Sequence, residues 1–287
     1  MKIPVVFLHV GEQDYFADAI NIAGRKNQVY VLGNQTGEFL KKINKGCNVS
    51  FYNIQKYNLA GELFKSVYEH FHSGAVPQQV ICYVRWFMIR NFMIENDISA
   101  IFHADSDLAV LSDMTEVYKA RAAPNLALMT QSNQPDYRWV ASGHGSFWSI
   151  KAMCDFCDYI IESYQNPIEK QKLQEKYRWH LANNVEGGVC DMTQLYLFSR
   201  NYKTQSLSLV WEDDNSCFDD NVNSSENYNP DEYEMQYGIK KILSNKDSFY
   251  FVTKNNKSIL THTIHCQGVA TKPFLTQIAI YLRSKCE

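Results

Sequence analysis

Short apolar runs alternate with stretches of helical spacing through the first part of the chain. Residues 3–10 and 28–32 are nearly continuous apolar runs, residues 15–23 and 38–43 have helical spacing, and residues 49–52 form a third apolar run. Runs that are apolar on both faces are typical of strands buried between two layers of helices. We therefore expect an α/β fold with a mainly parallel, Rossmann-like central sheet flanked by helices.

The rest of the chain continues this pattern with longer helices. A helix is predicted over residues 80–95, because its apolar residues form a broad stripe at helical spacing, and a buried strand follows over 99–103. Later runs predict strands over 125–129, 145–150, 206–211, 249–253 and 259–264, helices over 151–164, 168–179 and 192–199, and a polar loop over 212–234. Neither a repeat nor a low-complexity linker interrupts residues 1–287, so we expect a single domain.

Composition and charge exclude several classes of protein. The net charge of −3 creates no strong field towards nucleic acid or an anionic membrane, so neither is an expected partner. No run approaches the roughly 20 apolar residues that span a bilayer, and the short apolar run over residues 1–8 is interpreted as a strand rather than a signal peptide. Cys154 and Cys157 form a lone C-x-x-C, which we expect as two half-buried thiols on a helical turn. These features predict a cytoplasmic protein without a transmembrane segment.

The tripeptide Asp105-Ser106-Asp107 directly follows the strand predicted over residues 99–103. In an extended segment, residues i and i+2 point the same way, so both carboxylates can reach one hard cation, which prefers oxygen ligands. Ligands of open α/β sheets lie beyond the carboxyl ends of the strands, where this motif is expected. The alternative is an acidic turn that caps a helix.

The segment from Arg85 to Met114, RWFMIRNFMIENDISAIFHADSDLAVLSDM, resembles the core of GT-A glycosyltransferases, in which an Arg-bearing helix leads into a strand that ends in D-x-D. The resemblance implies that Asp105 and Asp107 hold Mn²⁺ or Mg²⁺ against the diphosphate of a nucleotide-sugar donor, with Ser106 beside it. It also implies that Arg85 lies near the donor, where a fixed guanidinium suits phosphate oxygens. The alternative for Arg85 is a structural salt bridge.

Near its C-terminus the chain reads THTIHCQGVATKPF, which resembles the H-x-x-G-x-x-K-P-W signature of the glycogenin and galactosyltransferase family (family eight). In that family the His is a metal ligand and the Lys contacts the diphosphate. The resemblance implies these roles for His265 and Lys272, with Gly268 in the donor site. The spacing from Gly to Lys is one residue longer here, and Phe274 replaces Trp. His262 is a rival ligand, and a histidine buried in a strand is the alternative interpretation.

Further segments fit a donor and acceptor site by the same resemblance. In GT-A enzymes an acidic residue lies beside the acceptor and the sugar C1, and Asp191 in GGVCDMTQ matches it; its alternative role is a helix N-cap. Phe7 and His9 on the first predicted strand are expected to line the base pocket, where Tyr15 could stack. The small residues of 142–146 (SGHGS) are expected to contact the donor sugar or the acceptor.

The matches follow one another in the order strand, D-x-D, acidic loop and terminal His-Gly-Lys. They imply a metal-dependent glycosyltransferase that moves a sugar from a nucleotide-sugar donor, expected to be a UDP-sugar, to a glycan or other hydroxyl acceptor. The terminal signature implies retention of configuration, whereas inversion would use Asp191 as the general base. Two alternatives stay open: a haloacid-dehalogenase-like phosphatase that uses the first Asp of D-x-D as its nucleophile, and a non-catalytic sugar-binding module.

Overall fold

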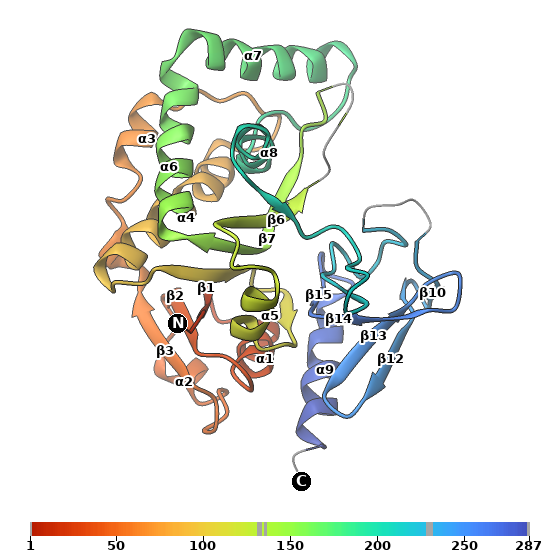
Figure 1. Ribbon diagram of the computed structural model, residues 1–287. Helices are drawn as coiled ribbons and strands as arrows, with labels where there is room; N and C mark the ends of the chain where they lie inside the picture. Colours follow the sequence, from red (N-terminus) through yellow and green to blue (C-terminus); the bar gives the residue numbers. More distant parts are fainter. Residues whose placement is uncertain (1, 131–133, 135–136, 228–231, 286–287) are drawn as a thin grey trace.

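The computed structural model describes residues 2–130, 134, 137–227 and 232–285 (Figure 1). Within these residues the central sheet consists of β1 (Val5–His9), β2 (Val29–Gly33), β3 (Val49–Asn53), β4 (Ala100–Ala104), β6 (Leu126–Thr130), β7 (Ala141–Ser149) and β8 (Gln205–Ser206). Their order is β3-β2-β1-β4-β7-β6-β8. Strand β7 runs antiparallel to β4 and β6, and the other neighbouring pairs are parallel. The mainly parallel sheet that the sequence predicts is therefore confirmed.

Helices cover both faces of this sheet. Successive residues of a strand point to opposite faces, so neighbouring residues of β1 belong to different cores. Val5 of β1 joins one core with residues of the first, second and fifth helices, whereas its neighbour Val6 joins another with residues of the third, fourth, sixth and eighth. The helices are α1 (Asp14–Ala23), α2 (Gly37–Leu40), α3 (Glu62–Val67), α4 (Val76–Glu95), α5 (Met114–Ala120), α6 (Ile150–Gln165), α7 (Pro167–Ala182), α8 (Asp191–Asn201) and α9 (Lys272–Arg283), with a 3₁₀ turn over Ile54–Tyr57.

The C-terminal part of the chain, together with one short strand that follows the D-x-D, forms smaller sheets beside the central one (Figure 1). As far as the chain is described, these sheets contain β5 (Leu108–Val110), β9 (Ser216–Cys217), β10 (Met235–Gln236), β11 (Ile239–Lys240), β12 (Ile242–Asn245), β13 (Ser248–Val252), β14 (Ser258–Thr261) and β15 (Thr263–His265). Strand β15 runs antiparallel to β5, which begins directly after the D-x-D. Helix α9 packs against α1 over a third core that includes Ile22 and Leu275. The last segment of the chain therefore lies against the carboxyl end of β4.

Several elements differ from the sequence predictions. The strand predicted over 206–211 is wrong beyond its first residue, because β8 ends at Ser206 and Trp211 makes only an isolated bridge to Ser216. The strand predicted over 259–264 is divided at His262 into β14 and β15. The short helix α5 and the final helix α9 lie outside the predicted elements. Part of the predicted polar loop, residues 228–231, lies outside the described residues.

Two further expectations concern single features. Cys154 and Cys157 lie on α6 as free thiols, the first half-buried and the second buried, close to the predicted helical turn. Among the described residues, no helix combines the length and the apolar character that crossing a membrane requires.

Candidate active site

The D-x-D motif meets the C-terminal segment through backbone pairing. Strand β5 follows Asp107 at once, and its pairing with β15 sets Leu108 opposite His265. The backbone N–H of Cys266 donates to the carbonyl of Asp107 at 2.9 Å. This register brings Nε2 of His265 to 3.5 Å from Oδ1 of Asp107. Two residues from separate sequence motifs therefore face each other in the structure.

His265 is held with Nε2 facing that carboxylate. Its Nδ1 lies 2.5 Å from the backbone carbonyl oxygen of Asp220, which can only accept, so Nδ1 carries a hydrogen. Burial alone would lower the pKa of His265, but the hydrogen bond to Asp107 and the charge of that carboxylate raise it to about 9. A positive charge is therefore favoured beside Asp107. A cation bound at Nε2 would take the place of this proton.

A second imidazole stacks on His265. The ring centres of His144 and His265 are 4.0 Å apart and the rings are nearly parallel, at 10°. Nε2 of His144 lies 3.0 Å from the carbonyl oxygen of Asp219, and its Nδ1 lies 2.7 Å from the hydroxyl of Ser142. Burial, and then the charge of His265, lower the pKa of His144 to about 3. His144 is therefore neutral next to a positively charged neighbour, and donates from Nε2.

Arg85 of α4 joins the D-x-D to the start of α8. Its Nη1 donates to Oδ1 of Asp105 at 3.0 Å, and its Nη2 donates to Oδ2 of Asp191 at 2.7 Å. The indole N–H of Trp86 donates to the same Asp191 oxygen at 3.1 Å. Burial alone would raise the pKa of Asp105, but the charge of Arg85, with His103 also nearby, holds it well below its usual value. Arg85 therefore lies at the D-x-D and forms the structural salt bridges of the alternative interpretation, while its place beside a donor stays a prediction.

Asp191 is the first residue of α8, and the N-cap of that helix is Cys190. The interpretation of Asp191 as an N-cap is therefore wrong, and its buried side chain points to Arg85 instead. Gly188 makes this placement possible. Its φ is +142°, and a Cβ at this position would lie 2.2 Å from the carbonyl oxygen of Phe71. Only glycine permits this close crossing of two backbone segments.

The residues expected to bind the nucleotide also lie near one another. Nζ of Lys272 lies 4.5 Å from the ring centre of Tyr15, whose ring centre is 6.2 Å from that of His9. Burial lowers the pKa of His9; a hydrogen bond with Gln13 opposes this effect, and the charge of Lys272 adds to it. The structure thus gathers His9, Tyr15 and Lys272 at the carboxyl end of β1.

Three other predicted residues are placed as follows. Phe7 is fully buried and its ring centre lies 5.6 Å from that of Phe16, so its side chain belongs to the core rather than to a surface that a base could contact. Gly268 follows β15 and has a φ of +84°, a left-handed conformation that favours glycine. Ser106 is half-buried between the two aspartates.

His262 lies apart from the D-x-D. Its Nδ1 is 2.8 Å from the hydroxyl of Ser112, and its Nε2 is 3.0 Å from the hydroxyl of Ser216. His262 is thus a buried structural histidine at the bend between β14 and β15. Of the two rival histidines, the structure brings His265 and not His262 to the D-x-D.

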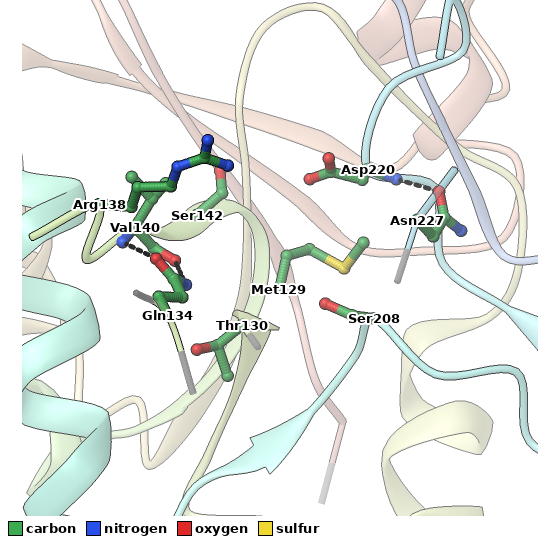
Figure 2. A pocket seen from close by; sticks show the side chains of 9 residues that line it. All are labelled: Met129, Thr130, Gln134, Arg138, Val140, Ser142, Ser208, Asp220 and Asn227. Atoms are coloured by element: carbon green, nitrogen blue, oxygen red, sulfur yellow. Dashed lines mark hydrogen bonds between the residues drawn. The ribbon is translucent and has the colours of Figure 1, made fainter. Parts of the chain in front are cut away.

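A polar pocket of about 250 Å³ opens beside the stacked imidazoles (Figure 2). Figure 2 shows Arg138 and Ser142 on one side of this pocket and Asp220 and Asn227 on the other. Ser142 contacts His144, and the backbone of Asp220 contacts His265, so the pocket adjoins the imidazole pair. The lining residues are Met129, Thr130, Gln134, Arg138, Val140, Ser142, Ser208, Asp220 and Asn227. Most of these side chains are polar, which suits a ligand rich in hydroxyl groups.

The D-x-D and the residues that face it include ligand types that a hard divalent cation takes. Carboxylates suit Mg²⁺ and Mn²⁺, and the bond from Nδ1 of His265 to a backbone carbonyl is the arrangement that orients a metal-binding histidine. One oxygen of Asp105 is already engaged by Arg85. In the part of the chain that the structure describes, no three His, Cys, Asp or Glu side chains are gathered into a formed metal site. Asp107 and His265 are therefore the pair best oriented towards an ion, with Asp105 next to them.

Comparison with known proteins supports the fold. No family model matches the chain, and no curated protein matches its sequence. The chain is similar in structure to mouse xyloside xylosyltransferase 1 in its apo form, with a TM-score of 0.50 and 10% sequence identity. The match covers 72% of this chain and 84% of that chain. The chain has the GT-A fold. At this identity the likeness concerns the fold alone.

The residues that lie behind the imidazoles belong to no motif in the sequence. Asp219 falls in a stretch predicted only as a polar loop, and Lys240 falls outside every predicted element, yet both side chains are fully buried and form an ion pair at 2.6 Å. Trp86 stands next to Arg85, and its place within the predicted helix over residues 80–95 gives no sign of a contact with Asp191. His144 lies in the segment expected to contact sugar, but it is buried against His265.

Proposed function

We propose that this chain is a metal-dependent glycosyltransferase, which moves a sugar from a nucleotide-sugar donor such as a UDP-sugar to a hydroxyl group of a glycan or other acceptor. The observation that carries the proposal is the meeting of Asp107 and His265 beyond the carboxyl end of β4, in a GT-A sheet. The proposal treats residues 1–287 as one catalytic domain, because the candidate site uses residues from His9 to Lys272.

The donor diphosphate would lie between the D-x-D and the start of α9. Mn²⁺ or Mg²⁺, held by Asp107 and His265 with Asp105 beside them, would supply positive charge as the leaving diphosphate becomes more negative. Lys272 would add a second positive charge from the first residue of α9, where the helix N-terminus also favours phosphate. The ring of Tyr15, which lies under Lys272, offers a face on which the base could stack.

We further propose that the sugar is transferred with retention of its configuration. Oδ2 of Asp191 accepts from both Arg85 and Trp86, so this carboxylate is held in one orientation. A carboxylate engaged in this way is better suited to stabilising positive charge at the sugar C1 than to taking a proton from the acceptor. The acceptor would enter through the polar pocket beside Ser142 and Asp220 (Figure 2).

Calorimetric titration of UDP tests the donor site. We expect binding in Mn²⁺ and its loss in EDTA. Asp107→Asn should weaken binding in Mn²⁺, because it removes an anionic ligand. His262→Gln is the matched control, since His262 contacts serines away from the D-x-D and its loss should leave UDP affinity unchanged. Equal UDP affinity in Mn²⁺ and in EDTA would contradict the metal-bridged donor.

A second assay separates this function from the other classes. The protein is incubated with UDP-sugars and Mn²⁺, and release of UDP is measured; a generic phosphate ester is tested in parallel. A glycosyltransferase should slowly hydrolyse its UDP-sugar donor to UDP and free sugar even without an acceptor. Hydrolysis of the phosphate ester instead would favour a phosphatase, and binding of sugars without turnover of any donor would favour a sugar-binding module.

A further inference from the structure

A fully buried ammonium group lies at the centre of the loop over residues 218–227. Lys240 of β11 has no exposed side-chain surface, and its Nζ donates to Oδ1 of Asp219 at 2.6 Å. It also donates to the side-chain oxygen of Asn227 at 2.8 Å and to the backbone carbonyl of Asn221 at 2.8 Å. The ammonium group of Lys240 therefore bonds to residues near the start of this loop and to its last residue at the same time.

The same loop holds both imidazoles of the candidate site. Oδ2 of Asp219 accepts from the backbone N–H of His265 at 2.9 Å, and the carbonyl of Asp219 accepts from Nε2 of His144 at 3.0 Å. The carbonyl of the next residue, Asp220, accepts from Nδ1 of His265. These contacts place a hydrogen on Nε2 of His144 and on Nδ1 of His265, and they leave the other nitrogen of each ring facing away from the loop. The orientation of His144 and His265 thus depends on the position of two neighbouring peptide groups.

A buried ion pair of this kind is poorly explained by stability alone. Taking two charges out of water costs about as much as their attraction returns, and apolar residues of similar size often replace such pairs without loss of stability. Lys240 and Asp219 hold backbone groups that an apolar pair could not hold, because their bonds reach Asn221 and His265. Their bonds therefore fix the geometry of the loop rather than merely fill its interior.

We propose that Lys240 and Asp219 are positioning residues, which hold the loop 218–227 in the conformation that aims His265 at Asp107 and fixes the tautomer of His144. The role in metal binding rests on the proposed function, but the orientation of the rings does not. Asp220 and Asn227 of the same loop line the polar pocket (Figure 2), so the ion pair also positions one wall of that pocket.

The decisive variant is Lys240→Met combined with Asp219→Leu, which removes both charges and keeps the interior apolar. Arg121→Met is the matched control. Arg121 is also a buried cation, paired to Asp214 at 2.6 Å, but its contacts lie around Ser216 rather than at the imidazoles. Asp219→Asn keeps the shape of the side chain and serves as a milder variant should the double variant fail to fold.

The first readout is the ¹⁵N spectrum of the histidine rings in the metal-free protein near neutral pH. In the wild type, the resonances of His144 should show a single tautomer with its hydrogen on Nε2. In the folded double variant, and in part in Asp219→Asn, these resonances should move towards the average of the two tautomers. Arg121→Met should lower the melting temperature and leave the His144 resonances unchanged.

The second readout is the affinity for Mn²⁺ alone, measured by calorimetry. Loss of an outer contact that orients a metal-binding histidine typically weakens metal binding by roughly 10- to 100-fold, and we expect this loss in the double variant. If the wild type binds no Mn²⁺, the proposed function fails, and the ring spectra still decide the positioning role. Folded variants with wild-type His144 resonances would overturn the proposal, whatever their melting temperature.

Discussion

The protonation of His262 provides a quantitative test of the structure. Burial, and then the charge of Arg121, lower the pKa of His262 from 6.5 to about 4. The folded protein therefore takes up a proton on this ring less readily than the unfolded chain does. The contribution of His262 to the free energy of unfolding is fully present above the unfolded pKa of 6.5. It is lost as the pH falls from 6.5 to about 4, and it does not change further below that value.

The size of this effect follows from the two pKa values. Between neutral pH and about pH 5, one such group should lower the free energy of unfolding by about 2 kcal/mol, and the complete loss at lower pH should reach about 3 kcal/mol. In His262→Gln the titrating ring is absent, while an amide can still bond one of the serine hydroxyls. We expect this variant to be less stable than the wild type at neutral pH, and the difference to shrink by about 2 kcal/mol at about pH 5.

The assay is urea unfolding of both proteins at a series of pH values, with the free energy of unfolding plotted against pH. His144, whose pKa is also lowered, titrates in both proteins and cancels in the difference between the two curves. Parallel curves over this range would refute the reasoning, because they would mean that His262 takes up its proton equally well in the folded and unfolded states.

Three further predictions follow from single contacts. Gly188→Ala should destabilise the fold by about 1–3 kcal/mol in urea unfolding, because its φ of +142° and the carbonyl of Phe71 leave no room for a methyl group; unchanged stability would show that the two segments can separate freely. Trp86→Phe should lower the free energy of unfolding by about 1–3 kcal/mol, since Asp191 loses a buried donor; a neutral effect in urea would mean that this bond carries no net energy. Lys272→Met should weaken UDP binding by about tenfold or more in calorimetry, because a charged donor to the diphosphate is lost; wild-type affinity would exclude Lys272 from the donor site.

The strands β1, β2 and β4 of the central sheet could be predicted from the sequence because they are largely apolar on both faces. Val5 and Val6 belong to cores on opposite sides of β1, so consecutive apolar residues are required there. The reversed direction of β7 could not be predicted in this way, because a strand with two buried faces has the same composition whether it runs parallel or antiparallel to its neighbours. The short strands near the C-terminus were largely missed, because pairs such as Met235–Gln236 in β10 are too brief to show a period.

The candidate site was predictable where a motif marked it. The pairing of β5 with β15 brings the residues of the two best-defined motifs, Asp107 and His265, to one place. The supporting residues carried no such mark. A buried Lys240 looks like a surface lysine in the sequence, and its partner Asp219 lies in a stretch of Asp, Asn and Ser. Which residues support a site is decided by contacts between distant segments, and no local pattern records them.

The pairing of β5 with β15 also bears on the order in which a ribosome makes this protein. The strands from β1 to β4 and the D-x-D are complete once residue 107 has been added, but the partner of Asp107 is made more than 150 positions later. Throughout that interval the nascent chain carries the two carboxylates without His265 and without the start of α9. A nascent GT-A sheet could therefore form early, whereas the donor binding that we propose must wait until the last strand has left the ribosome.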